Sequence, residues 1–150
     1  MIQRIQSVYL LLVVGLLIGC ILLSMGSFGM NGATYQLMNY GVKDMQGVLV
    51  DKSVWALVTL LIVSALIAFS SIFMFVNRVF QIRMTIFNTI LFLGYYVTLV
   101  IFVIKFAKAA EFFTLGWGCC LPLVCMILNF LAIRAIGKDE FMVRAAERLR

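Results

Sequence analysis

The sequence predicts an all-α membrane protein: a four-transmembrane-helix bundle with a short outer β-hairpin or loop and a cytoplasmic amphipathic tail helix. Hydrophobic residues make up 65% of the 150 residues and charged residues only 12%, against about 45–50% and about 25% in ordinary soluble domains. A soluble domain of this length cannot bury so much apolar surface. The apolar residues also gather in four charge-free runs, and all of the positive charges lie before, between or after them.

Each of the four runs is long enough to cross a bilayer. A helix rises about 1.5 Å per residue, so a hydrocarbon core of about 30 Å needs about 20 residues. Backbone polar groups must be paired inside lipid, and a helix pairs them within one segment. We expect one four-span domain covering residues 1–150, with spans at residues 7–28, 54–76, 84–104 and 112–133 and a tail at residues 134–150.

The connections between the runs differ in length. Residues 77–83 and 105–111 are short, so spans two to four should form consecutive antiparallel hairpins. Residues 29–53 are longer and contain strand-like stretches at Thr34–Leu37 and Val48–Val50, separated by turn-forming residues. We expect a small β-hairpin on the outer surface there, with a disordered loop as the alternative.

The distribution of Lys and Arg predicts that both termini are cytoplasmic. With the N-terminus inside, the inner segments hold 8 of the 12 Lys and Arg residues, including every arginine, and the outer segments hold 4. Positive-inside statistics favour this orientation. The same pattern explains the net charge of +6 without nucleic acid, because no basic stripe with interleaved aromatic residues occurs.

The cysteines are read as packing residues. Cys20, Cys119, Cys120 and Cys125 lie inside apolar runs, and the chain has no histidine and no C-x-x-C spacing, so we expect no metal and no cofactor. Residues Leu17–Cys20 resemble the lipobox of bacterial lipoproteins, in which the cysteine is lipidated. The full spanning length of the first run favours a retained span over this alternative.

No catalytic set is recognisable, so we predict that the protein is not an enzyme. General acid–base catalysis needs His, Glu, Asp, Lys or Tyr in a protected pocket, and no acid lies within a span. Coupled transporters place ionisable residues within spans, and none is present here. Pro122 follows Gly116, Gly118 and two cysteines, so we expect a kinked or loosely wound outer half of span four, read as a packing kink.

Small residues suggest how the first span packs. Gly15 and Gly19 form a G-x-x-x-G motif, and Gly26 falls on roughly the same face of a continuous helix. Without side chains, two helix backbones can approach closely. We expect this face to pack within the four-helix unit more than against another protein. A similar small face in span two is formed by Ser64, Ala68 and Ser71.

Two asparagines are expected to pair between spans three and four. Asn88 and Asn129 lie at similar depth on antiparallel spans. An unpaired amide in lipid costs several kcal/mol. We therefore predict a shared interhelical hydrogen bond, with Thr85 or Thr89 as further partners.

The tail is the most polar segment of the chain. Gly137 is expected to end span four, and Asp139 to cap a new helix with Glu140 and Arg144 as an i, i+4 pair. The apolar face of that helix would consist of Phe141, Met142, Ala145 and Leu149.

Two interpretations of the tail remain open. An amphipathic helix could lie on the anionic inner leaflet, or it could dock on a cytoplasmic partner by the same apolar stripe. The candidate contacts to partner or lipid are Arg134, Lys138, Asp139, Glu140, Phe141, Arg144 and Arg148.

The two ends of the chain carry a family resemblance. Residues Met1–Leu10 and Ala132–Glu140, continuing through Val143–Arg144 to Arg148–Arg150, resemble a family of uncharacterised four-span inner-membrane proteins from Bacteroidota, a domain of unknown function. The resemblance implies a bacterial inner membrane and no site residues.

The function expected from these observations is that of a non-enzymatic scaffold or accessory subunit of a larger inner-membrane complex. Its partners would be the lipid bilayer, other membrane proteins and further copies of itself. A small transporter or oligomeric channel is the main alternative, and an intramembrane enzyme acting on lipid or thiol is a third.

Overall fold

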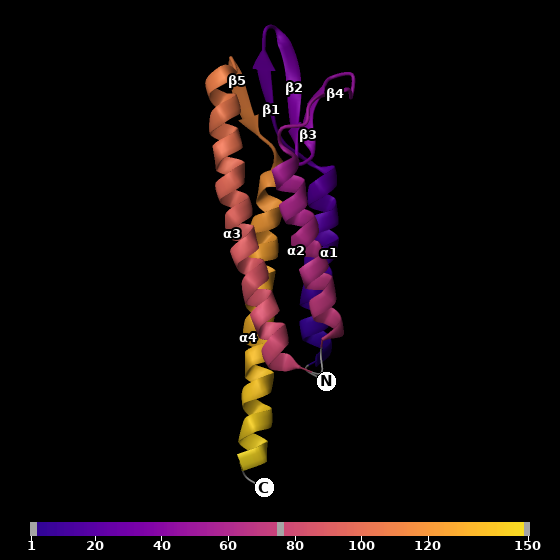
Figure 1. Ribbon diagram of the computed structural model, residues 1–150, viewed down its shortest axis with the longest axis vertical. Helices are drawn as coiled ribbons and strands as arrows, with labels where there is room; N and C mark the ends of the chain where they lie inside the picture. Colours follow the sequence, from indigo (N-terminus) through magenta and orange to yellow (C-terminus); the bar gives the residue numbers. More distant parts are fainter. Residues whose placement is uncertain (1–2, 75–76, 149–150) are drawn as a thin grey trace.

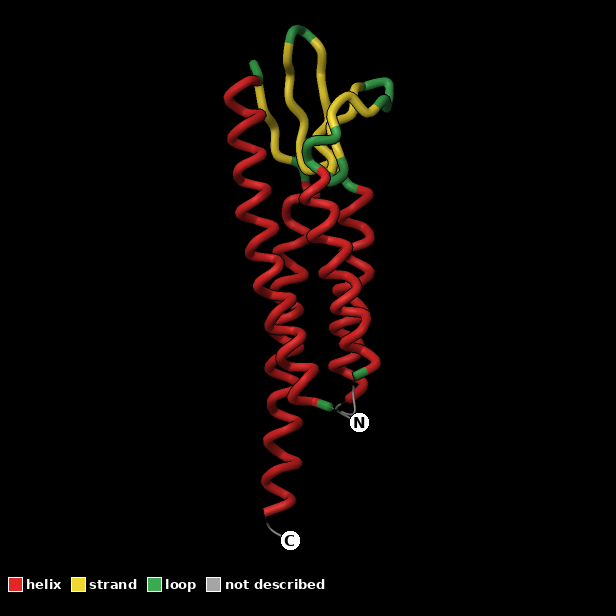
Figure 2. Tube along the Cα trace, viewed as in Figure 1, coloured by secondary structure: helices red, strands yellow, loops and turns green. Residues whose placement is uncertain are grey.

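The computed structural model describes residues 3–74 and 77–148, which form four helices and a small sheet (Figure 1). The helices lie side by side along the long axis, and the sheet covers one end of them (Figure 2). We call the four helices the helical body, the end with the sheet the sheet end, and the opposite end the tail end. The helices are α1 (Gln3–Leu22), α2 (Trp55–Phe73), α3 (Arg78–Ala109) and α4 (Leu121–Arg148).

Each helix packs against two others. The contacts join α1 to α2 and α4, and α3 to α2 and α4. The helices differ in length: α1 has 20 residues, whereas α3 has 32 and α4 has 28. The extra length of α3 extends beside the sheet, and that of α4 extends beyond the other helices at the tail end (Figure 1).

Three stretches of the described chain are helical, long and apolar enough to cross a membrane by length and composition. They are Trp55–Phe73, Arg78–Ala109 and Trp117–Ala145, and Ser7–Leu22 is a shorter apolar helix. The structure thus places helices within all four predicted runs, but the bounds of the first and fourth differ from the prediction.

The sheet has five antiparallel strands in the order β4-β3-β2-β1-β5. Thr34–Leu37 lies within β2 and Val48–Val50 overlaps β4, so strands form at both stretches. The two stretches do not form a single hairpin, because β3 lies between β2 and β4 in the sheet. The β1–β2 hairpin turns at Asn31 and Gly32, both with positive φ, as a two-residue hairpin requires. The strands are β1 (Ser24–Met30), β2 (Ala33–Met38), β3 (Gly41–Asp44), β4 (Leu49–Asp51) and β5 (Phe112–Leu115).

The prediction of helical spans at residues 7–28 and 112–133 was wrong at the sheet end. Helix α1 ends at Leu22 and is followed by β1, while β5 and a 3-10 helix, η1 (Trp117–Cys120), precede α4. Strand β5 pairs with β1, so the backbone groups of both are satisfied without a helix. Hydrophobicity alone does not distinguish an apolar strand from the end of an apolar helix.

The predicted break in the fourth span was also wrong. Helix α4 runs through Gly137 to Arg148, so Gly137 does not end it and Asp139 does not cap a new helix. A glycine inside a helix costs only about 1 kcal/mol, and the good helix formers around it maintain the helix. Pro122 is the second residue of α4, where its missing N–H breaks no intrahelical bond. The loosely wound segment is η1, before the proline.

The helical body buries several polar side chains and exposes many large apolar ones. Large apolar residues such as Leu66, Val97, Ile101 and Phe130 are exposed. Apolar residues also fill much of the interior, including Leu17, Leu57, Leu61 and Phe92. The buried polar residues of α2, α3 and α4 are Ser64, Ser71, Gln81, Thr85, Asn88, Asn129 and Asp139.

Candidate functional site

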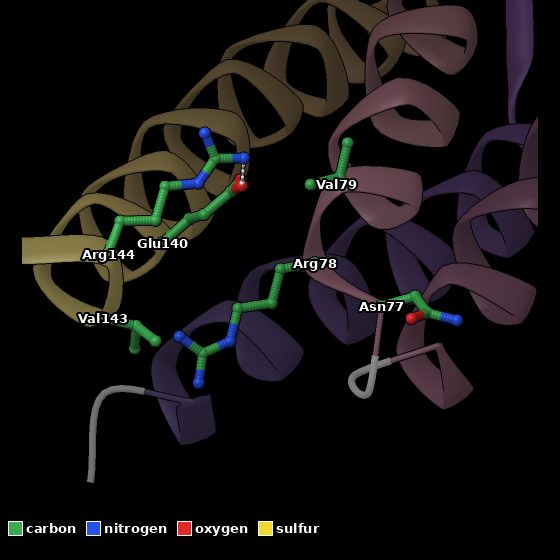
Figure 3. Close-up of a pocket in the computed structure, with 6 residues that line it drawn as sticks. All are labelled: Asn77, Arg78, Val79, Glu140, Val143 and Arg144. Carbon is green, nitrogen blue, oxygen red and sulfur yellow. Dashed lines mark hydrogen bonds and ion pairs between the residues drawn. The ribbon is translucent and has the colours of Figure 1, made fainter. Parts of the chain in front are cut away.

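A polar groove of about 420 Å³ lies between the start of α3 and the tail of α4 (Figure 3). It forms because α4 continues past the first residues of α3, which leaves one side of the tail uncovered. The lining includes two arginines and one glutamate, among two aliphatic side chains. These residues are Asn77, Arg78, Val79, Glu140, Val143 and Arg144.

Ion pairs organise this groove. Arg78 Nη1 lies 3.1 Å from Asp139 Oδ2 and donates to the backbone oxygen of Asp139 at 3.3 Å. Both side chains are largely buried, so the pair fixes the start of α3 against α4. Arg144 pairs with Glu140 one turn away on the groove wall (Figure 3), as their i, i+4 spacing predicted.

The predicted contact residues of the tail have different surroundings. Asp139 is buried and paired, whereas Arg134 and Lys138 are exposed. Only Glu140 and Arg144 line the groove. The side chain of Arg148 lies outside the described part of the structure. Sequence reasoning missed Arg78; its position at the inner start of the third span was the available signal, because it places the arginine near the tail.

Apolar side chains are exposed on the projecting part of α4. Phe141 is 75% exposed, and Met142 and Val143 are exposed beside it. A second hollow of about 290 Å³ lies at Gly137 and Phe141, next to the polar groove. Because Gly137 has no side chain, the helix surface is open there. The tail end therefore combines an exposed aromatic ring, a hollow and two paired arginines.

The predicted hydrogen bond between Asn88 and Asn129 was wrong. Both side chains are buried, and none of their four polar atoms has a partner among the described residues. Thr85 Oγ1 donates to Gln81 O at 2.8 Å, and Thr89 Oγ1 donates to Thr85 O at 3.0 Å. The threonine hydroxyls are thus satisfied within α3, and neither bonds the asparagines.

The predicted packing face of Gly15, Gly19 and Gly26 does not form within the chain. A Cβ added at Gly15 or Gly19 would meet no atom of the described structure within 4 Å, so no neighbouring helix approaches these glycines closely. Gly26 lies in β1, where a Cβ would come 2.6 Å from Thr114 O. Its small size therefore serves the pairing with β5.

Asn39 joins the sheet to the helical body and was missed from the sequence. Its Nδ2 donates to Cys20 O at 2.7 Å, and Tyr95 Oη donates to its Oδ1 at 2.7 Å. Cys20 O is one of the last four carbonyls of α1, which lack helical partners. Asn39 thus caps α1 and contacts α3 from the turn after β2. In the sequence it appeared only as a turn former.

A third hollow, of about 240 Å³, lies on the sheet beside the end of α3. Phe28 stacks on Tyr35 and on Phe106, with ring centroids 5.6 and 5.2 Å apart. Asp51 lies at its edge, and hydrogen bonds from the Ser53 backbone N–H and hydroxyl lower the pKa of Asp51 below its ordinary value.

The cysteines are free thiols in the described structure. Cys20 is fully buried inside the fold of the full-length chain. No group of three or more His, Cys, Asp or Glu side chains lies together within residues 3–74 and 77–148.

Nearly the whole chain matches a known protein family. The family described as "Domain of unknown function (DUF4293)" matches residues 2–149. No curated protein matches the sequence. The match covers both the sheet and the tail end, so the groove and the Asn39 junction lie within the region that defines the family. The chain belongs to this family of unknown function, DUF4293.

Proposed function

We propose that the chain is a four-span protein of the bacterial inner membrane that acts as a scaffold or accessory subunit of a larger complex. Its tail end would lie in the cytoplasm and bind another protein. The proposal has three parts, namely the membrane, the orientation and the partner, and a different observation supports each.

The placement of apolar and polar side chains supports a location in the membrane. The helices expose large apolar residues all round, while amides and hydroxyls lie between them. Exposing so much contiguous apolar surface to water is unfavourable. In a hydrocarbon environment the same apolar surface is favourable, and polar side chains are more stable between the helices than facing lipid. Helix α1, with 20 residues, is about 30 Å long, which equals the thickness of a hydrocarbon core of about 30 Å. It would serve as the first span.

The distribution of Lys and Arg supports an orientation with the tail end in the cytoplasm. The tail end carries Arg78 and Arg83 at the start of α3, and Arg134, Lys138 and Arg144 along α4. The sheet end carries lysines and no arginine. Positive-inside statistics place the end with the greater basic excess in the cytoplasm.

The direction of α4 favours binding of the tail to a protein partner rather than to the membrane surface. The tail continues α4 along its axis, away from the helical body (Figure 1), whereas an interfacial amphipathic helix lies in the plane of the membrane. Phe141 on the projecting segment would then face water. A protein groove that covers Phe141 while Arg78 and Arg144 meet polar groups at its rim would match the usual anatomy of an interface.

The interior gives less support to the alternative of a channel within one chain. Polar residues follow α3 from Gln81 through Thr85 to Asn88, but Phe92 and Leu99 fill the next turns on the same buried face. The bulky apolar side chains of Phe92 and Leu99 would therefore interrupt a hydrated path along this face.

Site-specific photocrosslinking tests whether the tail end binds another protein. A benzophenone amino acid at Phe141 should give one crosslinked product of defined mass with a second protein, because its ring lies at the proposed interface. The same probe at exposed Leu66, in the middle of α2, is the control and should give no such product. The crosslinked partner should also co-purify at fixed stoichiometry with the native chain and not with the Phe141→Ser variant.

Two results would contradict the accessory role. The first is a crosslink from position 141 to copies of this chain alone. The second is ion flux through liposomes that contain only the purified chain, which would support the channel.

A further inference from the structure

A polar and an apolar hollow lie on the same side of the α3–α4 pair. At the tail end, the polar groove and the hollow beside it share Val79 of α3 and Glu140 of α4, and Gly137 lines the second of them. A fourth hollow, of about 390 Å³, lies deeper in the helical body between Leu93 of α3 and Phe130 of α4. Leu93 follows Val79 by about four helical turns, and Phe130 precedes Gly137 by about two. Because whole turns return to the same face of a helix, the hollows open on one side.

The fourth hollow has an apolar lining at the depth of an acyl chain. Its lining residues are Thr89, Leu93, Met126, Ile127 and Phe130. The hydroxyl of Thr89 donates to Thr85 O, so its proton is already used. Thr89 lies ten residues beyond Val79, which is about 15 Å along α3. A hydrocarbon core is about 30 Å thick, so the two hollows are separated by the depth of one leaflet.

Two unpaired arginines lie along the helices between these hollows. The pair of Arg78 with Asp139 sets the register of the antiparallel helices α3 and α4. Five residues along α3 and five residues back along α4 are Arg83 and Arg134, so these two residues lie at about the same level. Both are exposed, and neither forms an ion pair within the described part of the chain. Exposed arginines without a carboxylate partner attract an anionic group.

The arginines of the groove also have donors for an anion. Both contacts of Arg78 with Asp139 involve Nη1, and a guanidinium has five N–H donors. Arg144 faces the groove from α4 (Figure 3) and is 68% exposed in its pair with Glu140, so that pair is weak and open to competition. The groove encloses about 420 Å³, against about 30 Å³ for one water molecule. It therefore has room for a lipid headgroup rather than for a single ion.

We propose that this side of α3 and α4 binds one anionic phospholipid of the cytoplasmic leaflet, an inference that rests on the membrane location proposed above. The phosphate contacts Arg83 and Arg134, the headgroup occupies the groove at Arg78 and Arg144, and one acyl chain extends to the hollow at Leu93. Basic pockets between membrane helices on the cytoplasmic side bind anionic headgroups in this way. A free phosphate would leave the apolar hollow unused.

The charge preference is tested by native mass spectrometry of the purified chain in a mild detergent with added lipids. One phosphatidylglycerol molecule should bind at least about tenfold more tightly than phosphatidylcholine, because basic residues at the membrane surface favour a lipid with net negative charge. The double variant Arg83→Gln with Arg134→Gln should lose this preference. The control, Lys105→Gln with Lys108→Gln, removes the same charge at the sheet end and should keep it.

Matched tryptophans test the apolar hollow. Leu93→Trp fills the hollow and should weaken phosphatidylglycerol binding by about tenfold, which corresponds to about two methylene groups left unburied. Ile101→Trp introduces the same ring at a similarly exposed position of α3 and should bind as the native chain does. Glycerophosphoglycerol, which is phosphatidylglycerol without its acyl chains, should bind at least about a hundredfold more weakly.

Thermal unfolding separates loss of the site from loss of the fold. Phosphatidylglycerol should raise the unfolding temperature of the native chain and of the lysine variant, but not that of the arginine variant. Equal binding of the two lipids, equal losses in the arginine and lysine variants, or glycerophosphoglycerol binding as tight as that of the lipid would overturn the proposal. These results leave the crosslink from Phe141 unaffected, whereas a chain soluble without detergent would contradict the membrane location itself.

Discussion

Three buried asparagines show that the surroundings of a residue matter more than its type. Asn39 and Asn129 are both 0% exposed and Asn88 is 1% exposed. Asn39 uses its amide nitrogen and its amide oxygen in hydrogen bonds, to Cys20 and from Tyr95. Asn88 and Asn129 have no such bonds to the described residues. A buried polar group is favourable when it is paired and costly when it is not.

Replacing Asn39 and Asn129 by leucine should therefore have different effects on stability. Asn39→Leu leaves the Cys20 carbonyl and the Tyr95 hydroxyl without partners, and should lower the free energy of unfolding by about 1–3 kcal/mol. Asn129→Leu removes an unpaired amide and should leave the stability unchanged or raise it. Thermal unfolding in one detergent, followed by circular dichroism, checks both. Equal destabilisation by the two variants would contradict the structure and support the predicted hydrogen bond between Asn88 and Asn129.

Two glycines form a similar matched pair. Gly118→Ala places a methyl group 2.5 Å from Ser24 O, so we expect a loss of stability of about 1–3 kcal/mol, typical of overpacking. Gly15→Ala adds a methyl group in open space within α1, and should stabilise the helix by up to about 1 kcal/mol. The same unfolding assay measures both variants. A loss of stability in Gly15→Ala would show that another helix covers this face.

At the scale of elements, the contact between α3 and the tail of α4 includes a largely buried ion pair. Arg78 and Asp139 connect the first turn of α3 to the part of α4 that leaves the helical body. Glu140 and Arg144 pair within α4 alone, with the arginine well exposed. Exposed pairs are screened by water, so the two pairs should differ in strength.

Double-mutant cycles should measure that difference. Arg78→Gln with Asp139→Asn should give a coupling free energy of about 1 kcal/mol or more, because removing one partner leaves a largely buried charge. Glu140→Gln with Arg144→Gln should give about 0.3–0.5 kcal/mol, as for exposed i, i+4 pairs. Equal coupling in the two cycles would mean that Arg78 does not hold α3 against α4.

The positions of the helices along the chain were predicted from the sequence more accurately than the residues at which the helices begin and end. The lengths of the charge-free runs located all four helices, because both the length of a run and its lack of charge can be read directly from the sequence. It could not show that Ser24–Met30 and Phe112–Leu115 leave the helices to pair as β1 and β5, because that choice depends on a contact between residues far apart in the chain. Asn31-Gly32 was a local signal for the hairpin.

The site was partly predictable for the same reason. Glu140 and Arg144 follow from helical spacing. Arg78–Asp139 and Asn39–Tyr95 join residues 61 and 56 positions apart, and no pattern along the chain indicates them. Equal depth suggested that Asn88 and Asn129 pair, but depth does not fix the rotation of a helix about its axis.

At the scale of the whole molecule, one arrangement accounts for most of the observations. Apolar side chains cover the outside of the helices, polar side chains lie between them, and the arginines gather at the tail end. The sheet covers the opposite end (Figure 2). A chain with this distribution is suited to a bilayer that surrounds the helices and separates the sheet from the tail.

Labelling from one side of the membrane tests this arrangement most directly. Met45 at the sheet end and Phe141 at the tail end are both 75% exposed, so Met45→Cys and Phe141→Cys, each in a Cys120→Ser background, form a matched pair. A membrane-impermeant maleimide should label Met45→Cys in intact spheroplasts and Phe141→Cys only after the membrane is opened. Labelling of Phe141→Cys in intact spheroplasts, or recovery of the chain in the soluble fraction without detergent, would contradict the account.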